Sequence, residues 1–225
     1  MLCAYEAQCI EIYAHSAQSR AMNTSWKTIL LAALGTMGMA FEGYAQDRTL
    51  TVLVLDYAGL PDSSLNEIES LSGLLLSSAS IQTQWVHCLG HQAGPRPVLC
   101  DSHLETGSVL IRILKTGSGS QNGLGDRVGS ARVESGYASL NASEISKYAE
   151  RNELPADSLM AYAMTHEIGH LLLGVNHEPT GIMRAVWGKA ELREIARGSL
   201  RFCTREREAL RQALPALGQP VEGLK

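Results

Sequence analysis

Two histidines and a glutamate stand close together near the middle of the second half of the chain, in the run His166-Glu167-Ile168-Gly169-His170. On an α-helix, imidazoles four residues apart lie on the same face and can reach one metal ion. Glu167 follows the first histidine directly, which places its carboxylate beside the metal, where it can take a proton from a water molecule. The five residues therefore predict a catalytic zinc site on a helix.

A tetrahedral catalytic zinc ion needs a third protein ligand and keeps one position open for water. The next turn of the helix offers only leucines, residues 171–173. Gly174 can adopt a backbone conformation that ends the helix and turns the chain back. His177, three residues past that glycine, can then approach the metal from below, so we expect His166, His170 and His177 to hold one catalytic zinc ion.

The run from His166 to Met183 resembles the signature of the metzincin zinc metalloproteases, HExxHxxGxxH followed by a methionine-containing turn, and is similar to that of small exported bacterial members. The resemblance implies these roles: zinc ligands at His166, His170 and His177, a general base at Glu167, a helix-ending turn at Gly174 and a turn methionine at Met183. One spacing differs, because three residues separate His170 from Gly174 where the family has two.

The fold that the resemblance implies is an α+β, zincin/metzincin-like domain: a mixed twisted sheet with an edge strand over the cleft, an active-site helix, a Met-turn and C-terminal helices. The implied function is that of a secreted zinc-dependent endopeptidase, whose protein or peptide substrate lies along the edge strand, placed at residues 131–140. Residues 184–187 would line the floor of its specificity pocket.

Two other functions stay open. A gluzincin-type peptidase would take its third zinc ligand from a later helix, at Glu191 or Glu194. A zinc-stabilised binding module would hold the metal without catalysis, although it would have no need of Glu167.

Hydrophobic patterning predicts the elements that position these residues, within a single domain over residues 46–225. Strands are expected at 49–57, 81–88 and 108–115, with an interrupted strand at 131–141 and a glycine-rich loop at 116–130. Helices are expected from Ser63 or Ser64 to Ser78 and at 143–151, 158–173, 189–197 and 204–213. The helix at 158–173, which Pro155 opens, should pack its apolar side on the sheet and turn its histidines into the cleft.

An export signal is predicted ahead of this domain. Residues 22–45 combine Lys27, an apolar run and the small residues of a cleavage site before Gln46, so residues 1–21 are read as an over-extended start. The apolar run is shorter than the roughly 20 residues of a spanning helix, which favours cleavage over a stable membrane span. We therefore expect a secreted or periplasmic protein.

Cysteine usage and charge are consistent with this location. Cys88 and Cys100 flank a short Gly- and Pro-containing segment and are the expected disulfide pair, which leaves Cys203 over. The net charge of -4, with no basic stripe, gives no indication of nucleic-acid binding. Nothing in the sequence indicates an oligomeric state.

Overall fold

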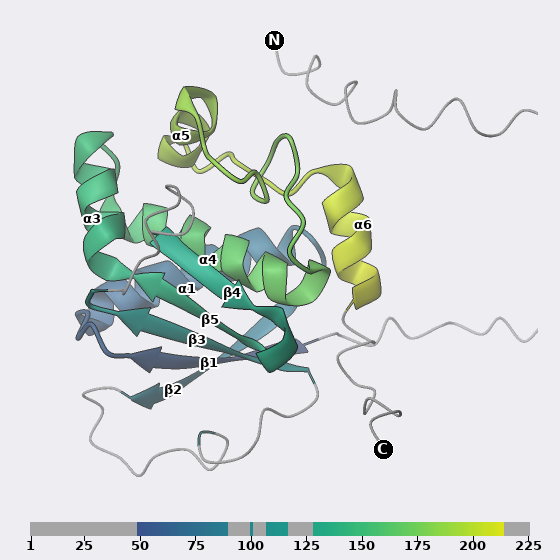
Figure 1. Ribbon diagram of the computed structural model, residues 1–225, viewed down its shortest axis with the longest axis horizontal. Helices are drawn as coiled ribbons and strands as arrows, with labels where there is room; N and C mark the ends of the chain where they lie inside the picture. Colours follow the sequence, from purple (N-terminus) through teal and green to yellow (C-terminus); the bar gives the residue numbers. More distant parts are fainter. Residues whose placement is uncertain (1–48, 90–99, 101–106, 117–127, 214–225) are drawn as a thin grey trace, which may run out of the picture. The chain divides into compact units, whose positions relative to one another are not determined.

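Five strands form one mixed sheet in the order β2-β1-β3-β5-β4 in the computed structural model, which describes residues 49–89, 100, 107–116 and 128–213 (Figure 1). The strands are β1 (Thr49–Asp56), β2 (Gln82–Leu89), β3 (Ser108–Leu114), β4 (Gly129–Arg132) and β5 (Tyr137–Asn141). Strands β2, β1, β3 and β5 are parallel to one another, and β4 runs antiparallel to β5. The expected signal segment, residues 22–45, and residues 1–21 lie outside the described residues.

The position of β1 inside the sheet explains its sequence. This strand pairs with β2 on one side and β3 on the other, with Val52 opposite both Trp85 and Val109. A strand inside a parallel sheet reads as a nearly continuous apolar run, as residues 50–55 do. Leu50, Val52 and Val54 are fully buried, and with the alternate residues of β3 they form the part of the core beneath the helices.

Residues 131–141 do not form one interrupted strand, and that expectation is wrong. Gly129–Arg132 form β4, residues 133–135 form a single 3-10 turn, and Gly136, at a φ of 64°, reverses the chain into β5. The break expected at Ser135-Gly136 is therefore the turn of a hairpin. Of these two strands only β4 lies at an edge of the described sheet, because β5 pairs with both β3 and β4.

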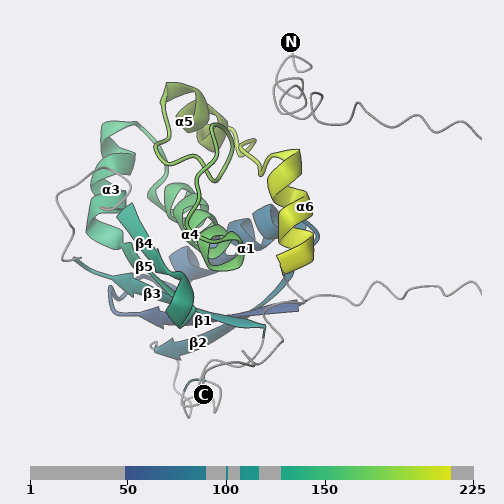
Figure 2. The ribbon, with the colours of Figure 1, turned by 45° about the vertical axis from the view of Figure 1, so that its right-hand side comes forward.

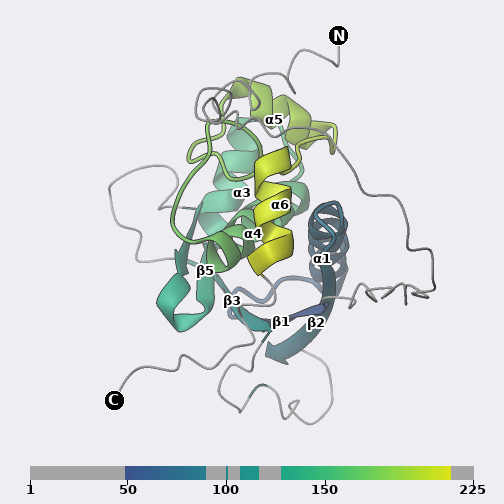
Figure 3. The same ribbon diagram turned by 90° about the vertical axis from the view of Figure 1, so that its right-hand side faces the viewer.

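The helices lie on one face of the sheet (Figures 1 and 3). They are α1 (Asp62–Ser77), α3 (Ala142–Arg151), α4 (Ala156–Leu173), α5 (Lys189–Ala196) and α6 (Thr204–Ala213). Helix α1 begins at Asp62, ahead of the expected serine caps, and its Leu74 points away from the core with 67% of its surface exposed. Its neighbours Leu75 and Leu76 are buried.

Helix α4 is the centre of the helical layer, with α3 and α6 on either side of it (Figure 2). Thirteen of its eighteen residues are buried. The expectation of one apolar side and one open side is therefore too simple, since α1, α3, α5 and α6 all pack against this helix as well as the sheet. No helix in the described part of the chain is both long and apolar enough to cross a membrane.

The expected pairing of cysteines lies at the far edge of the sheet from β4. Cys88, in β2, forms a disulfide with Cys100, and the two Cα atoms are 5.3 Å apart. The two cysteines are separated by 12 positions in the sequence, and Cys88 lies in the edge strand β2. The disulfide therefore ties the chain at the edge of the described sheet opposite β4.

Candidate metal centre

The three histidines of the sequence motif meet at one point. His166 and His170 lie one turn apart on α4, and their Nε2 atoms are 2.9 Å apart. The Nε2 of His177 lies 3.2 Å from that of His170. Tetrahedral zinc with Zn–N bonds of about 2.0–2.1 Å separates its ligand nitrogens by roughly 3.3 Å, so this spacing fits a zinc ion.

Backbone carbonyls determine which nitrogen of each helical histidine faces the others. The Nδ1 of His166 lies 2.7 Å from the carbonyl oxygen of Ile182, and the Nδ1 of His170 lies 3.0 Å from that of Gly174. A carbonyl only accepts, so each Nδ1 carries the proton and each Nε2 carries a lone pair. Two lone pairs held this close repel one another unless a cation lies between them, which is the arrangement of a metal site.

Burial favours the neutral imidazoles that a metal requires. It lowers the pKa of His166 to about 4, against the opposing effect of the hydrogen bond to Ile182. Burial also lowers the pKa of His170, and the nearby His177 adds to the effect. Both ligands on the helix are therefore unprotonated at neutral pH, the form in which histidine binds metal.

The end of α4 carries the chain from His170 to His177. Helix α4 continues to Leu173, and the N–H of Gly174 still donates to the carbonyl of His170 at 2.9 Å. Gly174 then adopts a φ of 90°, which only glycine does without strain, and the chain turns back. The extra residue of the motif is thus taken up by the last turn of the helix, and His177, an exposed side chain, still reaches the cluster.

Met183 packs directly beneath the helix that holds the histidines. A methyl group added at Gly169 would lie 2.3 Å from the sulfur of Met183 and 3.0 Å from its Cε, far inside normal contact. Met183 is buried, as is Ile182, whose N–H donates to the carbonyl of Arg201 at 3.1 Å. The glycine within the HExxH run therefore serves close packing against the methionine turn.

A buried glutamate supports the same turn from the side of α6. The Glu206 carboxylate is 3% exposed and accepts the backbone N–H of Cys203 at 2.5 Å. Burial raises its pKa to about 7, although hydrogen bonds from the backbone of Cys203 and Met183 oppose the shift. Since the unfolded group titrates near 4.5, the fold favours the neutral acid, and stability falls as pH rises from about 4.5 to about 7.

Glu167 lies under the start of the edge strand. Its side chain is 6% exposed, and a methyl group added at Gly129 of β4 would lie 2.5 Å from its Oε1 and 2.9 Å from its Cδ. The strand can cross the carboxylate this closely only because residue 129 has no side chain. The contact limits where the carboxylate can sit relative to His166.

A pocket of about 50 Å³ opens beside His166 and Glu167. At about 10–15 Å³ per water molecule this space holds roughly three to five waters, or one small side chain. Its other walls are mainly apolar and come from Val128, Tyr148, Leu159, Ala163 and residues 184–187. Residues 184–187, which were expected at the floor of a specificity pocket, therefore line this pocket.

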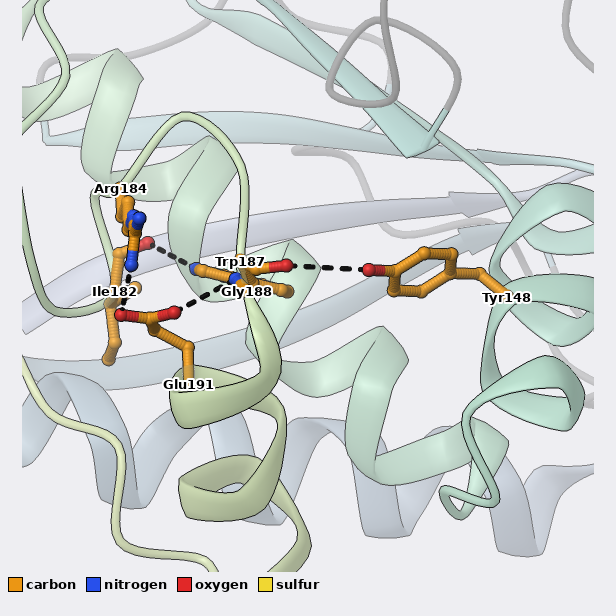
Figure 4. A network of polar contacts seen from close by, with 6 residues as sticks. All are labelled: Tyr148, Ile182, Arg184, Trp187, Gly188 and Glu191. Carbon is orange, nitrogen blue, oxygen red and sulfur yellow. Dashed lines mark hydrogen bonds and ion pairs between the residues drawn. The ribbon is translucent and has the colours of Figure 1, made fainter.

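The alternative third ligands do not join the cluster. Glu191 is buried at the start of α5, where its Oε1 accepts Arg184 Nη1 at 2.5 Å and its Oε2 accepts the N–H of Gly188 at 2.8 Å (Figure 4). Burial raises its pKa, but these hydrogen bonds outweigh burial and the pKa lies below its usual value. Glu191 is thus ionised and holds the loop after Met183 through these hydrogen bonds. Neither Glu191 nor Glu194 belongs to the group formed by the three histidines.

Several residues that shape the site gave no signal in the sequence. The carbonyls of Ile182 and Gly174 act through the backbone, which any residue type supplies. Trp187 was expected only at the floor of the pocket, yet its indole N–H also donates to the Ile182 carbonyl at 3.2 Å. Gly129 lies in a stretch that was expected to be a loop. A glycine in a strand can indicate a close contact with another segment, and here that contact is with Glu167.

Comparison with solved structures places this architecture among known folds. The crystal structure of an archaemetzincin from Methanopyrus kandleri is similar at a TM-score of 0.50 and 17% identity, over 76% of this chain and 99% of that one. A zinc-dependent peptidase from Methanocorpusculum labreanum matches at a TM-score of 0.46 and 16% identity, over 71% of this chain and 99% of that one. No family model and no curated protein matches the sequence. At these identities the likeness concerns the fold alone.

Proposed function

We propose that this protein is a metzincin-type, zinc-dependent endopeptidase. The observation that carries the proposal is the convergence of three histidine Nε2 atoms, two of them with the Nδ1 proton committed to a backbone carbonyl. The shared fold with an archaemetzincin supports it, and so does the motif resemblance from His166 to Met183.

His166, His170 and His177 would hold the ion. When bound, zinc acts as a Lewis acid that polarises the peptide carbonyl and makes water acidic enough to lose a proton near neutral pH. Glu167, adjacent in sequence to His166 and buried beside the pocket, is positioned to accept that proton on a carboxylate oxygen. The hydroxide so formed would attack the peptide carbonyl carbon, and Glu167 would return the proton to the amide nitrogen as the C–N bond breaks, which restores the carboxylate.

The surroundings of the histidines suit an extended peptide. Strand β4 is an edge of the described sheet, and its Gly129 lies over Glu167, so a peptide added antiparallel to β4 would pass the proposed base. A side chain next to the scissile bond would enter the pocket beside His166, whose volume and apolar walls favour a small aliphatic group. Main-chain pairing would supply affinity, and the pocket would supply selectivity.

Zinc content and hydrolysis, measured together, test this function. Wild type is expected to hold about one zinc ion per chain and to cleave a peptide library, whereas Glu167→Gln keeps the zinc and loses turnover. His177→Ala is expected to lose the zinc. Comparable turnover in Glu167→Gln would refute the role of the base, and equal zinc in His177→Ala would refute the third ligand.

The non-catalytic alternative makes a different prediction in the same assays. A zinc-stabilised binding module would hold the metal in wild type yet cleave no member of the library, and Glu167→Gln would change neither property. Hydrolysis by wild type that disappears with Glu167→Gln excludes that alternative.

Export is the second part of the proposal. It is supported by the signal-like segment at residues 22–45 and by the Cys88–Cys100 disulfide, since such bonds persist in oxidising compartments. Amino-terminal sequencing of the protein recovered outside the cytoplasm is expected to begin at Gln46. A mature chain that begins at Met1 or Met22 would contradict cleavage.

A further inference from the structure

One carbonyl oxygen receives two side-chain donors at the base of the metal centre. The oxygen of Ile182 accepts the Nδ1 proton of His166 at 2.7 Å and the indole N–H of Trp187 at 3.2 Å. Ile182 has no exposed surface, so water cannot replace a lost donor there. The orientation of this carbonyl, and through it that of the imidazole, is therefore set by both partners.

The indole also touches the imidazole directly. The rings of Trp187 and His166 are perpendicular, at 88°, with centroids 5.8 Å apart, and the ring of Tyr162 also meets the indole edge to face, at 6.4 Å and 83°. Edge-to-face aromatic pairs have a preferred relative orientation, so this contact restrains the angle between the two rings as well as filling space. Trp187 thus limits rotation of the His166 ring both through the carbonyl and by contact.

The chain around Trp187 is held in turn by two neighbouring helices (Figure 4). From α3, the hydroxyl of Tyr148 reaches the Trp187 carbonyl at 3.4 Å. From α5, Glu191 clamps the flanking residues Arg184 and Gly188. These contacts hold the backbone at Trp187 and on both sides of it, which limits where the indole can lie.

We propose that Trp187 is a positioning residue for the metal centre, one that holds His166 in its metal-binding orientation through the Ile182 carbonyl and by ring contact. The proposal rests on the proposed zinc function. Partners that orient a metal-binding histidine typically change metal affinity 10–100-fold when removed. Because His166 keeps its own bond to Ile182 when the indole N–H is lost, we expect the lower end, about tenfold.

Zinc affinity, measured by competition with a chromogenic chelator, tests this role in Trp187→Phe. Trp85→Phe is the matched control, since it makes the same chemical change on β2, at the opposite edge of the sheet from β4. Trp187→Phe should bind zinc about tenfold more weakly and shift the visible spectrum of the cobalt(II)-substituted protein. Trp85→Phe should match wild type in both. Trp187→Leu, which also removes the ring contact, should weaken binding further.

Each outcome decides the question. Affinity of Trp187→Phe within twofold of wild type, with an unchanged cobalt spectrum, overturns the proposal. Equal weakening in Trp85→Phe also overturns it, because the effect would then be a general loss of stability. Failure of wild type to bind zinc refutes the proposed function instead, so the two failures are distinguishable.

Discussion

Replacing Gly129 by alanine tests whether the close approach of strand β4 to Glu167 sets the position of this proposed base. The new Cβ would lie 2.5 Å from Oε1 of Glu167, whereas ordinary van der Waals contact begins near 3.4 Å. The carboxylate, or the strand, must therefore move by about 0.9 Å, the difference between these two distances. The three atoms nearest to that Cβ all belong to Glu167, so we expect the metal site itself to be unaffected.

The size of the effect follows from this displacement. A misplacement of about 1 Å in a catalytic group can cost roughly 100-fold in rate. We expect kcat/KM of Gly129→Ala to fall about 10–100-fold, or about 1.4–2.7 kcal/mol of transition-state stabilisation. Relief by movement of β4 instead of Glu167 would appear mainly in KM, because the peptide is proposed to pair with that strand.

The assay is steady-state hydrolysis of one peptide substrate, with zinc content measured on the same samples. Ser130→Ala is the matched control, since Ser130 is the next residue of β4 and its side chain is exposed. It should retain wild-type kinetics and zinc. Wild-type kcat/KM in Gly129→Ala, or a loss that follows zinc content, would refute the reasoning.

Two further predictions concern the support of the methionine turn. Gly169→Ala forces a methyl group to 2.3 Å from the Met183 sulfur, so overpacking should lower the free energy of unfolding by about 1–3 kcal/mol; chemical denaturation measures this, and an unchanged midpoint would contradict the packing. Glu206→Gln keeps a hydrogen-bond acceptor but removes the buried titration. Relative to wild type its stability should rise as the pH increases from about 4.5 to about 7, by up to about 3 kcal/mol in total. Denaturation curves measured across that range test this, and a constant difference would show that Glu206 does not titrate there.

The helix and its three histidines could be predicted because their signal is local. Spacing of four puts His166 and His170 on one face of any α-helix, and a glycine such as Gly174 is what a chain needs to turn back at its end. The strands over residues 49–56, 82–89 and 108–114 were predictable for the same reason, from continuous runs of apolar and β-branched residues.

What the sequence could not supply depends on contacts between distant segments. Whether residues 129–141 make one strand or a hairpin is decided by pairing with β3, which no local pattern encodes. Burial of α4 on every side follows from four other helices packing on it. The second donor to the Ile182 carbonyl needed Trp187 to fold back five residues, and the tryptophan alone gave no indication of its partner.

The carbonyl of Gly174 has a consequence for how such sites are found. Gly174 ends α4, and its carbonyl oxygen also accepts the Nδ1 proton of His170. The same residue therefore terminates the helix and orients one of the proposed metal ligands. What must be preserved is that spatial relation, and the number of intervening residues can change if the last turn absorbs it. A linear search with fixed gaps would pass over this chain, whereas a three-dimensional template of imidazoles and carbonyl acceptors would detect it.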